Sequence, residues 1–439
     1  MEGAGLHNLV SLAGIFVLMF LAWLLSTDRR TIHWKAVLGG TALQLLIALF
    51  IFVVPAGAKA FLFINDAVVK ALDSASAGTR FVFGRLALPP GARGEGGEES
   101  LGFILAFQAL PAIVFFASLM SALYYAGVMP RLIRFFARIF TRTLGVSGAE
   151  SLSVSSNIFV GVEANMTVLP HLGGMTRSEL CTILSAGMAT TASNVLALYV
   201  FLLQRQFPAI AGHLVSASIL SAVSAVVVSK LIFPETEAPA TLGVDVAPHY
   251  ERESSVIEAV IKGANEGARM IVGIVALLLA FLGLVALADL ALGGIGSRIN
   301  ALAGISFDWS LKGLLGYIFY PLTLVIGVPV SDAAEVSRLI GERTILTEVK
   351  AYQDLAAALA AGAVRSPRSA VIAAYALCGF AHVASLAIFV GGTAALVPHR
   401  TKDLSRIGPR ALAAATLACL MTAAVAGTFY TGSSVLFGK

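Results

Sequence analysis

Charged residues are scarce in this sequence. They make up only 13% of the 439 residues, while 58% are hydrophobic and the mean hydropathy is +0.87. A soluble globular protein carries about 25% charged residues, so this chain lacks the polar cover that a surface in water requires. A soluble globular fold is therefore excluded, and a lipid bilayer is the expected surrounding of most of the chain.

Cysteine is scarce as well, and the sequence lacks the usual metal-binding and catalytic motifs. The three cysteines, Cys181, Cys378 and Cys419, all lie in apolar segments, so we expect buried free thiols and no disulfide framework. No His-x-x-His or Cys-x-x-Cys pair occurs, which predicts no metal centre and no resident cofactor. The chain also has no Gly-x-Ser-x-Gly elbow, His-Glu-x-x-His motif or P-loop, which argues against an enzyme.

Long apolar runs are abundant. Several approach the roughly 20 residues that a helix needs to cross about 30 Å of hydrocarbon. The first leads from near Met1 into Thr27-Asp28-Arg29-Arg30 without a small-residue cleavage pattern, so we expect a retained helix. The sequence therefore predicts a multi-pass membrane protein of the cell inner (plasma) membrane. The clearest runs are residues 9–25, 36–54, 102–124, 214–233, 270–292, 311–328 and 411–429.

The positive charges are grouped between these runs. The net charge of +5 does not point to nucleic acid as a partner, because the basic residues lie at the ends of predicted spans. By the positive-inside rule these groups face the cytoplasm, which places the N-terminus outside. The linker 234–252 is then a cytoplasmic loop and residues 88–100 an external one. The basic groups are Arg29, Arg30 and Lys35; Arg131, Arg134, Arg138 and Arg142; and Arg400, Lys402, Arg406 and Arg410.

Two apolar segments, 151–170 and 331–355, are interrupted by polar and charged residues. Such segments lie at membrane depth only when protein or a wet cavity surrounds them, which favours re-entrant hairpins. Each is followed by a basic residue and a serine and then by a long helix with polar residues near its middle. With the N-terminus outside, the two units are inverted repeats, an arrangement in which transporters bind substrate at the bilayer midplane.

We therefore expect an all-α fold with about eight transmembrane helices and two re-entrant hairpins in an inverted repeat. Four parts follow from this organisation. They are scaffold helices with an interfacial helix (1–143), the first transport repeat (144–233), a linker with a scaffold helix and an external helix (234–330), and the second transport repeat (331–439).

The most specific local motif is the run GVSGAESLSV at 145–154, which leads into NIFVG at 157–161. This motif resembles the signature of the concentrative nucleoside transporter family. Residues 110–116, 124–129 and 375–381 are similar to other segments of that family, and the resemblance continues in order along nearly the whole chain. It implies a homotrimer and an elevator-type motion, in which a rigid unit of the two hairpins and the broken helices that follow them moves across a fixed scaffold.

The resemblance also implies roles for individual residues. It assigns Glu348, His382 and Ser385 to the sugar of a nucleoside, and Glu163, Val195 and Phe380 to the base. His382 replaces an asparagine of the family. The family's Gln-Thr pair before the first hairpin glutamate is missing here, and Val162 takes its place. An apolar wall discriminates poorly, so we expect loose base selectivity.

The glutamates carry a functional prediction without the family. An ionised carboxylate at the bilayer centre costs at least about 2.5 kcal/mol, so it is rarely without a role. Glu163 and Glu348 are placed to accept hydrogen bonds from a polar solute, and one carboxylate suits two vicinal hydroxyls. The structural alternative for Glu348 is an ion pair with Arg343 or Lys350. For His382 the alternative is a satisfied core histidine.

A sodium site is implied by the same resemblance. Its ligands are the side chains of Asn157 and Thr190 and the carbonyls of Val160 and Thr191, oxygen donors that suit a hard cation. As an alternative, Asn157 and Thr190 are simply hairpin and helix caps. A proton is the competing coupling ion, carried by Glu163 or His382.

The sequence thus predicts a symporter that imports nucleosides or closely related glycosides, driven by a sodium or proton gradient. Two other functions stay open at this point. One is a membrane-embedded hydrolase that uses Glu163 and Glu348 as an acid and base pair. The other is a nucleoside sensor built on a transporter scaffold.

Overall fold

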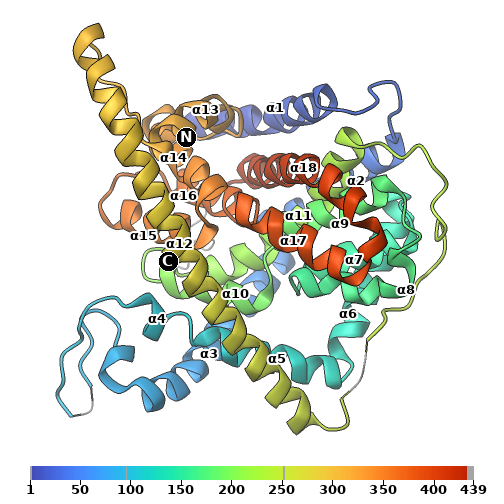
Figure 1. Ribbon diagram of the computed structural model, residues 1–439, viewed down its shortest axis with the longest axis horizontal. Coiled ribbons are helices and arrows are strands. Elements are labelled where there is room, and N and C mark those ends of the chain that lie inside the picture. The colour runs from blue at the N-terminus through green and yellow to red at the C-terminus, as the bar shows by residue number, and fades with distance from the viewer. Residues whose placement is uncertain (1, 95, 251–252, 433–439) are drawn as a thin grey trace.

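The computed structural model describes residues 2–94, 96–250 and 253–432 (Figure 1). In these ranges every regular element is a helix, and β pairing is limited to isolated bridges between Arg93 and Glu99 and between Ser147 and Leu242. The predicted all-α class is confirmed.

Seven segments of the described chain are long and apolar enough to cross a membrane. The half-helices α16 (Pro367–Ala376) and α17 (Val383–Leu396) are shorter and are separated by residues 377–382. The predicted polytopic membrane fold therefore stands. The seven segments are α1 (Glu2–Leu24), α2 (Trp34–Phe52), α4 (Leu105–Gln108) with α5 (Ala112–Tyr125), α9 (Arg177–Ala189) with α10 (Ser193–Leu203), α11 (Ile210–Ile232), α12 (Val256–Ala303), and η3 (Pro398–Arg400) with α18 (Thr401–Thr428).

Helix α3 (Pro55–Phe83) was not predicted from the sequence. Its polar residues, including Lys59, Asp66 and Lys70, interrupt any long apolar run, so hydropathy alone misses it. Its apolar residues still fall on one side, and Phe61 and Leu72 are buried. A helix of this kind satisfies its own backbone while it presents different faces to protein and to solvent. A short 3-10 turn, η1 (Gly84–Ala87), follows it.

The arginine-rich segment forms helix α6 (Val128–Leu144). Glycines with left-handed backbone conformations, Gly127 and Gly145, flank it at its two ends. Ile133, Ala137 and Phe140 are buried on one side, while Arg131, Arg138 and Arg142 belong to the other. The prediction of a helix with one basic face is confirmed.

Both interrupted segments fold as helical hairpins. The first consists of α7 (Gly148–Asn157), η2 (Val162–Val168) and α8 (Leu169–Leu172), and the second of α14 (Val330–Ile345) and α15 (Glu348–Ala360). The helix after each hairpin is broken near its middle, at 190–192 in the first repeat and at 377–382 in the second. The residue pattern predicted a long helix at each place, whereas the resemblance to the transporter family implied that both helices are broken. Extended backbone at Thr190 and at His382 is the local cause of the two breaks.

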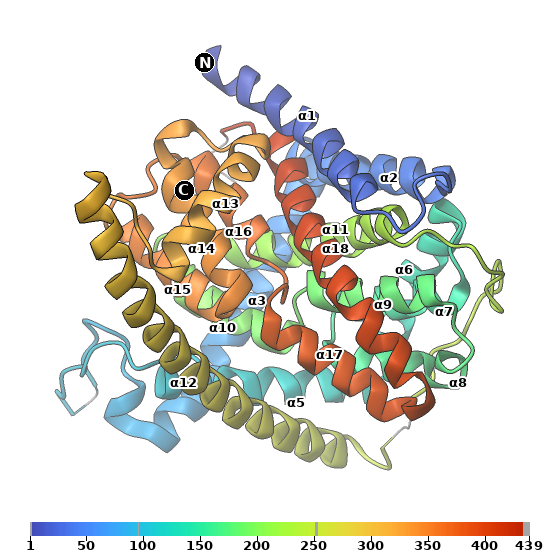
Figure 2. The same ribbon diagram turned by 45° about the horizontal axis from the view of Figure 1, so that its top comes forward.

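Helices α11 and α18 lie in the middle of the bundle (Figure 2). Almost all of α11 is buried, and it packs against α9 and α18. Helix α13 (Leu311–Val325) instead packs against the second hairpin. The fold therefore surrounds a buried centre made from both repeats.

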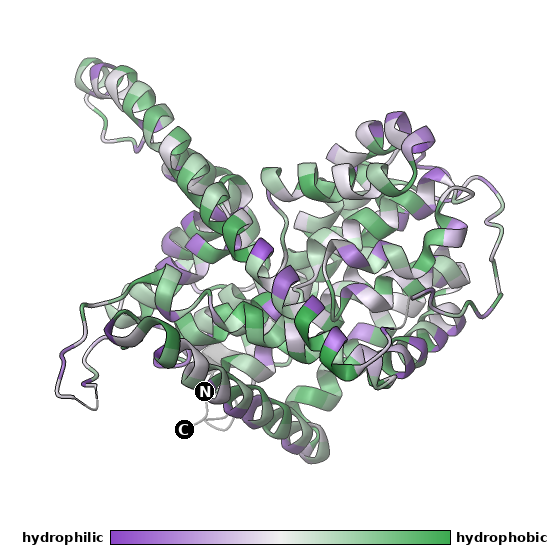
Figure 3. Ribbon diagram, turned by 60° about the horizontal axis from the view of Figure 1, so that its bottom comes forward, coloured by the Kyte–Doolittle hydropathy of each residue, from purple (hydrophilic) through white to green (hydrophobic). Residues whose placement is uncertain are grey.

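Helix α12 crosses one face of the molecule and extends beyond the rest of it (Figure 1). It packs tightly on α5, because a Cβ added at Gly263 or Gly267 would lie within 2.7 Å of α5 backbone atoms. Its opposite side is exposed, since Leu284, Leu287 and Leu290 are each more than half exposed. The green colour along much of this helix in Figure 3 shows that it is largely apolar. Such a surface suits contact with lipid or with another protein chain.

The segment 234–250 forms no helix, as the sequence predicted for a loop; the end of the predicted linker, Arg252, lies outside the described residues. This loop contacts the beginning of hairpin 1, where the backbone N–H of Gly148 donates to Thr241 O at 2.9 Å. A Cβ at Gly148 would lie only 1.9 Å from Val244 O, so this position in the signature requires glycine.

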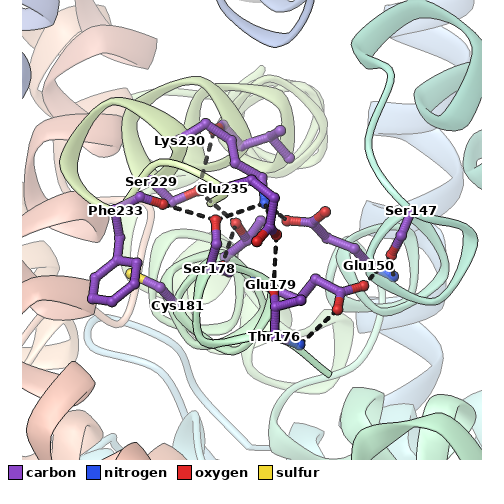
Figure 4. Close-up of polar contacts among 12 residues, drawn as sticks. Ser147, Glu150, Thr176, Ser178, Glu179, Cys181, Ser229, Lys230, Phe233 and Glu235 are labelled. Carbon is purple, nitrogen blue, oxygen red and sulfur yellow. Dashed lines mark hydrogen bonds and ion pairs between the residues drawn. The ribbon is translucent and has the colours of Figure 1, made fainter. Parts of the chain in front are cut away.

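Two further residues of the signature motif, Ser147 and Glu150, belong to a buried polar cluster (Figure 4). Ser147 caps α7 and donates a hydrogen bond to Glu179. Glu150 pairs with Lys230 at 2.8 Å, and Lys230 also donates to Ser178 Oγ at 2.9 Å. The cluster thereby joins hairpin 1 to the beginning of α9 and the end of α11.

Candidate functional site

A cavity of about 170 Å³ lies where the tips of the two hairpins meet the breaks of the broken helices. Part of α12 closes it with an apolar wall that includes Met270, Ile274 and Leu278. Six of the residues expected in the substrate site line this one cavity, although they come from segments far apart in the sequence. They are Glu163, Val195, Glu348, Phe380, His382 and Ser385.

Glu348 lies at the beginning of α15, where the positive end of the helix dipole favours a carboxylate. It is only 4% exposed. Its Oε1 accepts a hydrogen bond from the Tyr199 hydroxyl at 2.7 Å, and its Oε2 lies 2.9 Å from His382 Nε2. The carboxylate is thus held from two sides.

The alternative partners of Glu348 are engaged elsewhere. Arg343 donates to the carbonyl of Ala376 at 2.8 Å. Lys350 pairs with Asp354 and lies 3.8 Å from Glu342. The structural ion pair considered from the sequence is therefore replaced by the contacts with Tyr199 and His382.

His382 is the N-cap residue of α17. Its Nδ1 accepts from the backbone N–H of Ser385 at 3.2 Å, so in the neutral ring the proton is on Nε2. That nitrogen lies 2.8 Å from Ser385 Oγ and 2.9 Å from Glu348 Oε2. His382 is therefore satisfied, as the core alternative required, and it also lines the cavity.

Glu163 lies at the tip of hairpin 1 and is exposed to two cavities. The second cavity has a volume of about 340 Å³ and extends along α5 and α12 to His249 and Tyr250 of the loop. Tyr124 and Asn194 also line it, and Asn194 Oδ1 has no hydrogen-bond partner among the described atoms. The side chain of Val162 lies outside the described part of the structure.

The residues predicted to bind sodium lie where hairpin 1 meets the break between α9 and α10. Asn157 is buried, and its Nδ2 donates to Ser153 O at 3.0 Å. Its Oδ1 has no hydrogen-bond partner among the described atoms. An unpaired buried amide oxygen is costly unless a ligand satisfies it, so Asn157 fits a cation ligand.

The hydroxyl of Thr190 donates to Ala186 O at 2.8 Å, which leaves oxygen lone pairs for a cation. Thr190 is also the C-cap residue of α9, which agrees with the capping alternative. This position does not occupy the remaining lone pairs of its hydroxyl. Ser218 Oγ joins the two segments, because it lies 3.0 Å from Ile158 O and 3.4 Å from Thr191 O. Val160 lies beside them at the second cavity.

Family models match most of the chain. They describe a "Na+ dependent nucleoside transporter C-terminus" at residues 213–427, the corresponding N-terminus at 13–86, and "Nucleoside recognition" at 106–206. An "Uncharacterized transporter" of Haemophilus influenzae is 36% identical over 436 residues, which cover 96% of this chain and 97% of that protein. The chain belongs to the concentrative nucleoside transporter family.

Relatives with a described function are similar at the same level. Mouse "Solute carrier family 28 member 3" is 36% identical over 437 residues, which cover 96% of this chain but only 59% of the mouse protein. Mouse "Sodium/nucleoside cotransporter 1" is 34% identical over 97% of this chain and 64% of its own length. These family members are named as carriers or cotransporters and not as enzymes, and this chain spans less than two thirds of their length.

Solved structures of the transporter family have the same fold. CNTnw in an inward-facing substrate-bound state superposes with a TM-score of 0.86 at 36% identity, over 98% of this chain and 99% of that one. A CNTnw variant in an outward-facing state gives a TM-score of 0.85 at 35% identity, over 96% and 97%. Structures of both states support a transporter with alternating access.

Sequence reasoning missed Tyr199 and the α12 wall. A signal for Tyr199 was present, because a tyrosine in an apolar half-helix needs a partner for its hydroxyl. Its partner Glu348 lies 149 positions away in the sequence, so only the fold could identify it. The α12 residues are ordinary apolar residues, and nothing in their sequence distinguishes a cavity wall from a lipid-facing surface.

Proposed function

We propose that this protein is a symporter that imports nucleosides or closely related glycosides, driven by a sodium gradient. The observation that carries the proposal is the position of Glu348. Its buried carboxylate lies at a cavity between both repeats and is held by Tyr199 and His382. A fixed anion beside the hydroxyl of Ser385 suits the hydroxyl groups of a sugar.

The base of the nucleoside is proposed to lie toward Glu163, Val195 and Phe380, which line the same cavity. Phe380 supplies an aromatic face against which a base can stack. Glu163 supplies an acceptor at the border with the second cavity. This cavity is proposed to be the path toward the cytoplasm, since it reaches the loop that was predicted to lie there.

Sodium is the proposed coupling ion. The side-chain oxygens of Asn157 and Thr190 and the carbonyls of Val160 and Thr191 would hold it, and oxygen donors of this kind suit a hard monovalent cation. The bound cation would supply charge that joins the tip of hairpin 1 to the break before α10. A proton is the competing ion, with Glu163 as its carrier.

Transport is proposed to follow an elevator mechanism. The two hairpins and the broken helices that follow them would move as one unit across a fixed scaffold, to which the helices of 1–143 and 234–330 belong. The tight packing of α5 on α12 at Gly263 and Gly267 suits a fixed scaffold. We also propose a homotrimer in the cell inner (plasma) membrane, and the exposed apolar side of α12 offers a surface for other subunits.

Counterflow into liposomes tests the proposed transport. Vesicles that contain the purified protein and unlabelled uridine should take up labelled uridine, and Glu348→Gln should abolish most of this exchange. A nucleoside sensor on a transporter scaffold would bind uridine, as a thermal shift would report, but would exchange none across the membrane. Binding of uridine without exchange would contradict the proposed transport and favour the nucleoside sensor.

A further inference from the structure

Tyr199 contacts Glu348 from behind the cavity wall. Its side chain is fully buried, and its hydroxyl donates to Glu348 Oε1 at 2.7 Å. Among the described residues that line the cavity, Glu348 is present and Tyr199 is not. The bond connects half-helix α10 of the first repeat with the tip of the second hairpin, so it bridges the two halves of the proposed site.

The Tyr199 ring itself is held in place. It stacks on the ring of Tyr352 with a centroid distance of 4.6 Å and an interplanar angle of 29°. Tyr352 is also fully buried, and its hydroxyl donates to Ala374 O on α16 at 2.8 Å. The pair therefore offers a rigid support, in which one hydroxyl reaches the carboxylate and the other reaches only the backbone.

We propose that Tyr199 is a positioning residue, which fixes the rotation of the Glu348 carboxylate and thereby makes the site selective for a vicinal diol. The inference rests on the proposed role of Glu348 in sugar binding. A glutamate side chain has several rotatable bonds. Fixing them on ligand binding costs conformational entropy, which lowers the affinity unless the protein already holds the side chain in place.

The orientation matters because two hydroxyls on neighbouring carbons form a rigid pair. A carboxylate held at one angle can accept from both at the same time. A carboxylate that rotates freely gains much less from the second hydroxyl. Loss of the Tyr199 bond should therefore reduce the preference for ribose over deoxyribose, and not only the overall affinity.

Tyr199→Phe and Tyr352→Phe are a matched pair of variants. Each removes one buried hydroxyl and keeps the stacked rings, but only Tyr199→Phe changes a bond to Glu348. A role of Tyr199 in packing alone would make the two variants behave alike. The measurement is the half-saturating concentration of uridine, 2′-deoxyuridine and 3′-deoxyuridine for uptake into proteoliposomes.

We expect Tyr199→Phe to weaken uridine about tenfold or more, the loss typical of a hydrogen bond to a charged group. The affinity for the deoxy analogues should fall by less, so that the ratio of uridine affinity to deoxyuridine affinity decreases in Tyr199→Phe. Tyr352→Phe should leave that ratio unchanged. In a Glu348→Gln background, Tyr199→Phe should add no further loss of selectivity.

If Tyr199→Phe lowers the affinity for all three nucleosides by the same factor, the inference is overturned, while the proposed transport function stands. The same ratio in both tyrosine variants would overturn it as well. If Tyr199→Phe reconstitutes too poorly for uptake, equilibrium binding of the three nucleosides to the detergent-purified Tyr199→Phe and Tyr352→Phe variants supplies the same ratios. Wild-type protein that takes up no nucleoside would overturn the proposed function, and the role of Tyr199 with it.

Discussion

Lys230 Nζ lies 2.8 Å from Glu150 Oε1 inside the bundle, and the two side chains are only 3% and 1% exposed. Glu235 lies 3.6 Å from the same ammonium group. Glu179 belongs to the same cluster through Thr176, which also binds Glu235 (Figure 4). One lysine thus balances several buried carboxylates at the base of hairpin 1.

Lys230→Met should lower stability strongly, because it leaves these carboxylates buried without their cation. Removing one partner of a buried ion pair typically costs about 3–5 kcal/mol. Glu150→Gln should lower stability by less, because Lys230 keeps Glu235 as a charged partner. The apparent melting temperature of the purified protein checks this order. Arg93→Met is the control, because Arg93 and Glu99 are 75% and 72% exposed and such pairs contribute about 0–1 kcal/mol.

The double variant Glu150→Gln/Lys230→Met provides a further check of the buried pair. It removes one charge of each sign, so it should be more stable than Lys230→Met alone. Equal stability of the double variant and Lys230→Met would contradict the ion pair as the main interaction of Lys230.

Glu348→Gln should reduce the affinity for nucleosides by about tenfold to a hundredfold, which corresponds to one hydrogen bond to a charged group. Expression and oligomeric state should remain. Competition for labelled uridine uptake measures the effect. Glu335→Gln, on the other arm of the same hairpin, is the control. Unchanged affinity in Glu348→Gln would show that this carboxylate does not bind the sugar.

Asn157→Ala and Thr190→Ala should each raise the sodium concentration needed for half-maximal uptake. Nucleoside affinity should recover partly at high sodium, because coupling between two binding sites is reciprocal. Ser185→Ala is a matched control, since Ser185 also donates to the carbonyl four residues earlier in α9. Uptake that ignores sodium but follows an imposed pH gradient would contradict the sodium site and point to Glu163 as a proton carrier.

Purine and pyrimidine nucleosides should compete within about tenfold of each other, or roughly 1.4 kcal/mol. The reason is that Val162 replaces the Gln-Thr pair of the family and offers no side-chain donor or acceptor. Free bases should bind much more weakly, because the contacts at Glu348 and Ser385 go unused. A competition series with uridine, cytidine, adenosine, inosine and their bases measures both effects.

A hundredfold preference for one base would contradict loose selectivity. Asn194 is then the first residue to replace, since it lines the second cavity together with Glu163 and its buried Oδ1 has no hydrogen-bond partner among the described atoms. Asn194→Ala should remove the preference if this amide reads the base, and should leave it unchanged if another group does.

Much of the fold could be predicted from the sequence, because lipid imposes simple rules. Apolar runs of span length became helices, and runs with buried polar residues became hairpins. Helix α3 was not predicted, because Lys59, Asp66 and Lys70 interrupt its apolar run. Its apolar residues still share one face of the helix. The two helix breaks followed only from the resemblance to the family, because Thr190 and His382 occur in segments that are otherwise typical of a continuous helix.

The candidate site could be predicted as a set of residues but not as a network. Six of the substrate-site residues proposed from the sequence line one cavity, while their roles stay predictions. The partners of Glu348 could not be derived, since Tyr199 belongs to the other repeat and His382 is an unusual N-cap. Nor could Lys230 be paired with Glu150, because the ion pair depends on how α11 packs against hairpin 1.

Accumulation of labelled uridine in proteoliposomes tests the central claim most directly. With sodium outside and potassium inside, wild-type protein should concentrate uridine above its external level. The accumulation should disappear when sodium is equal on both sides, and in Glu348→Gln it should be strongly reduced at low uridine. Uridine that only equilibrates across the membrane, with the same final level with and without a sodium gradient, would contradict sodium-driven nucleoside import.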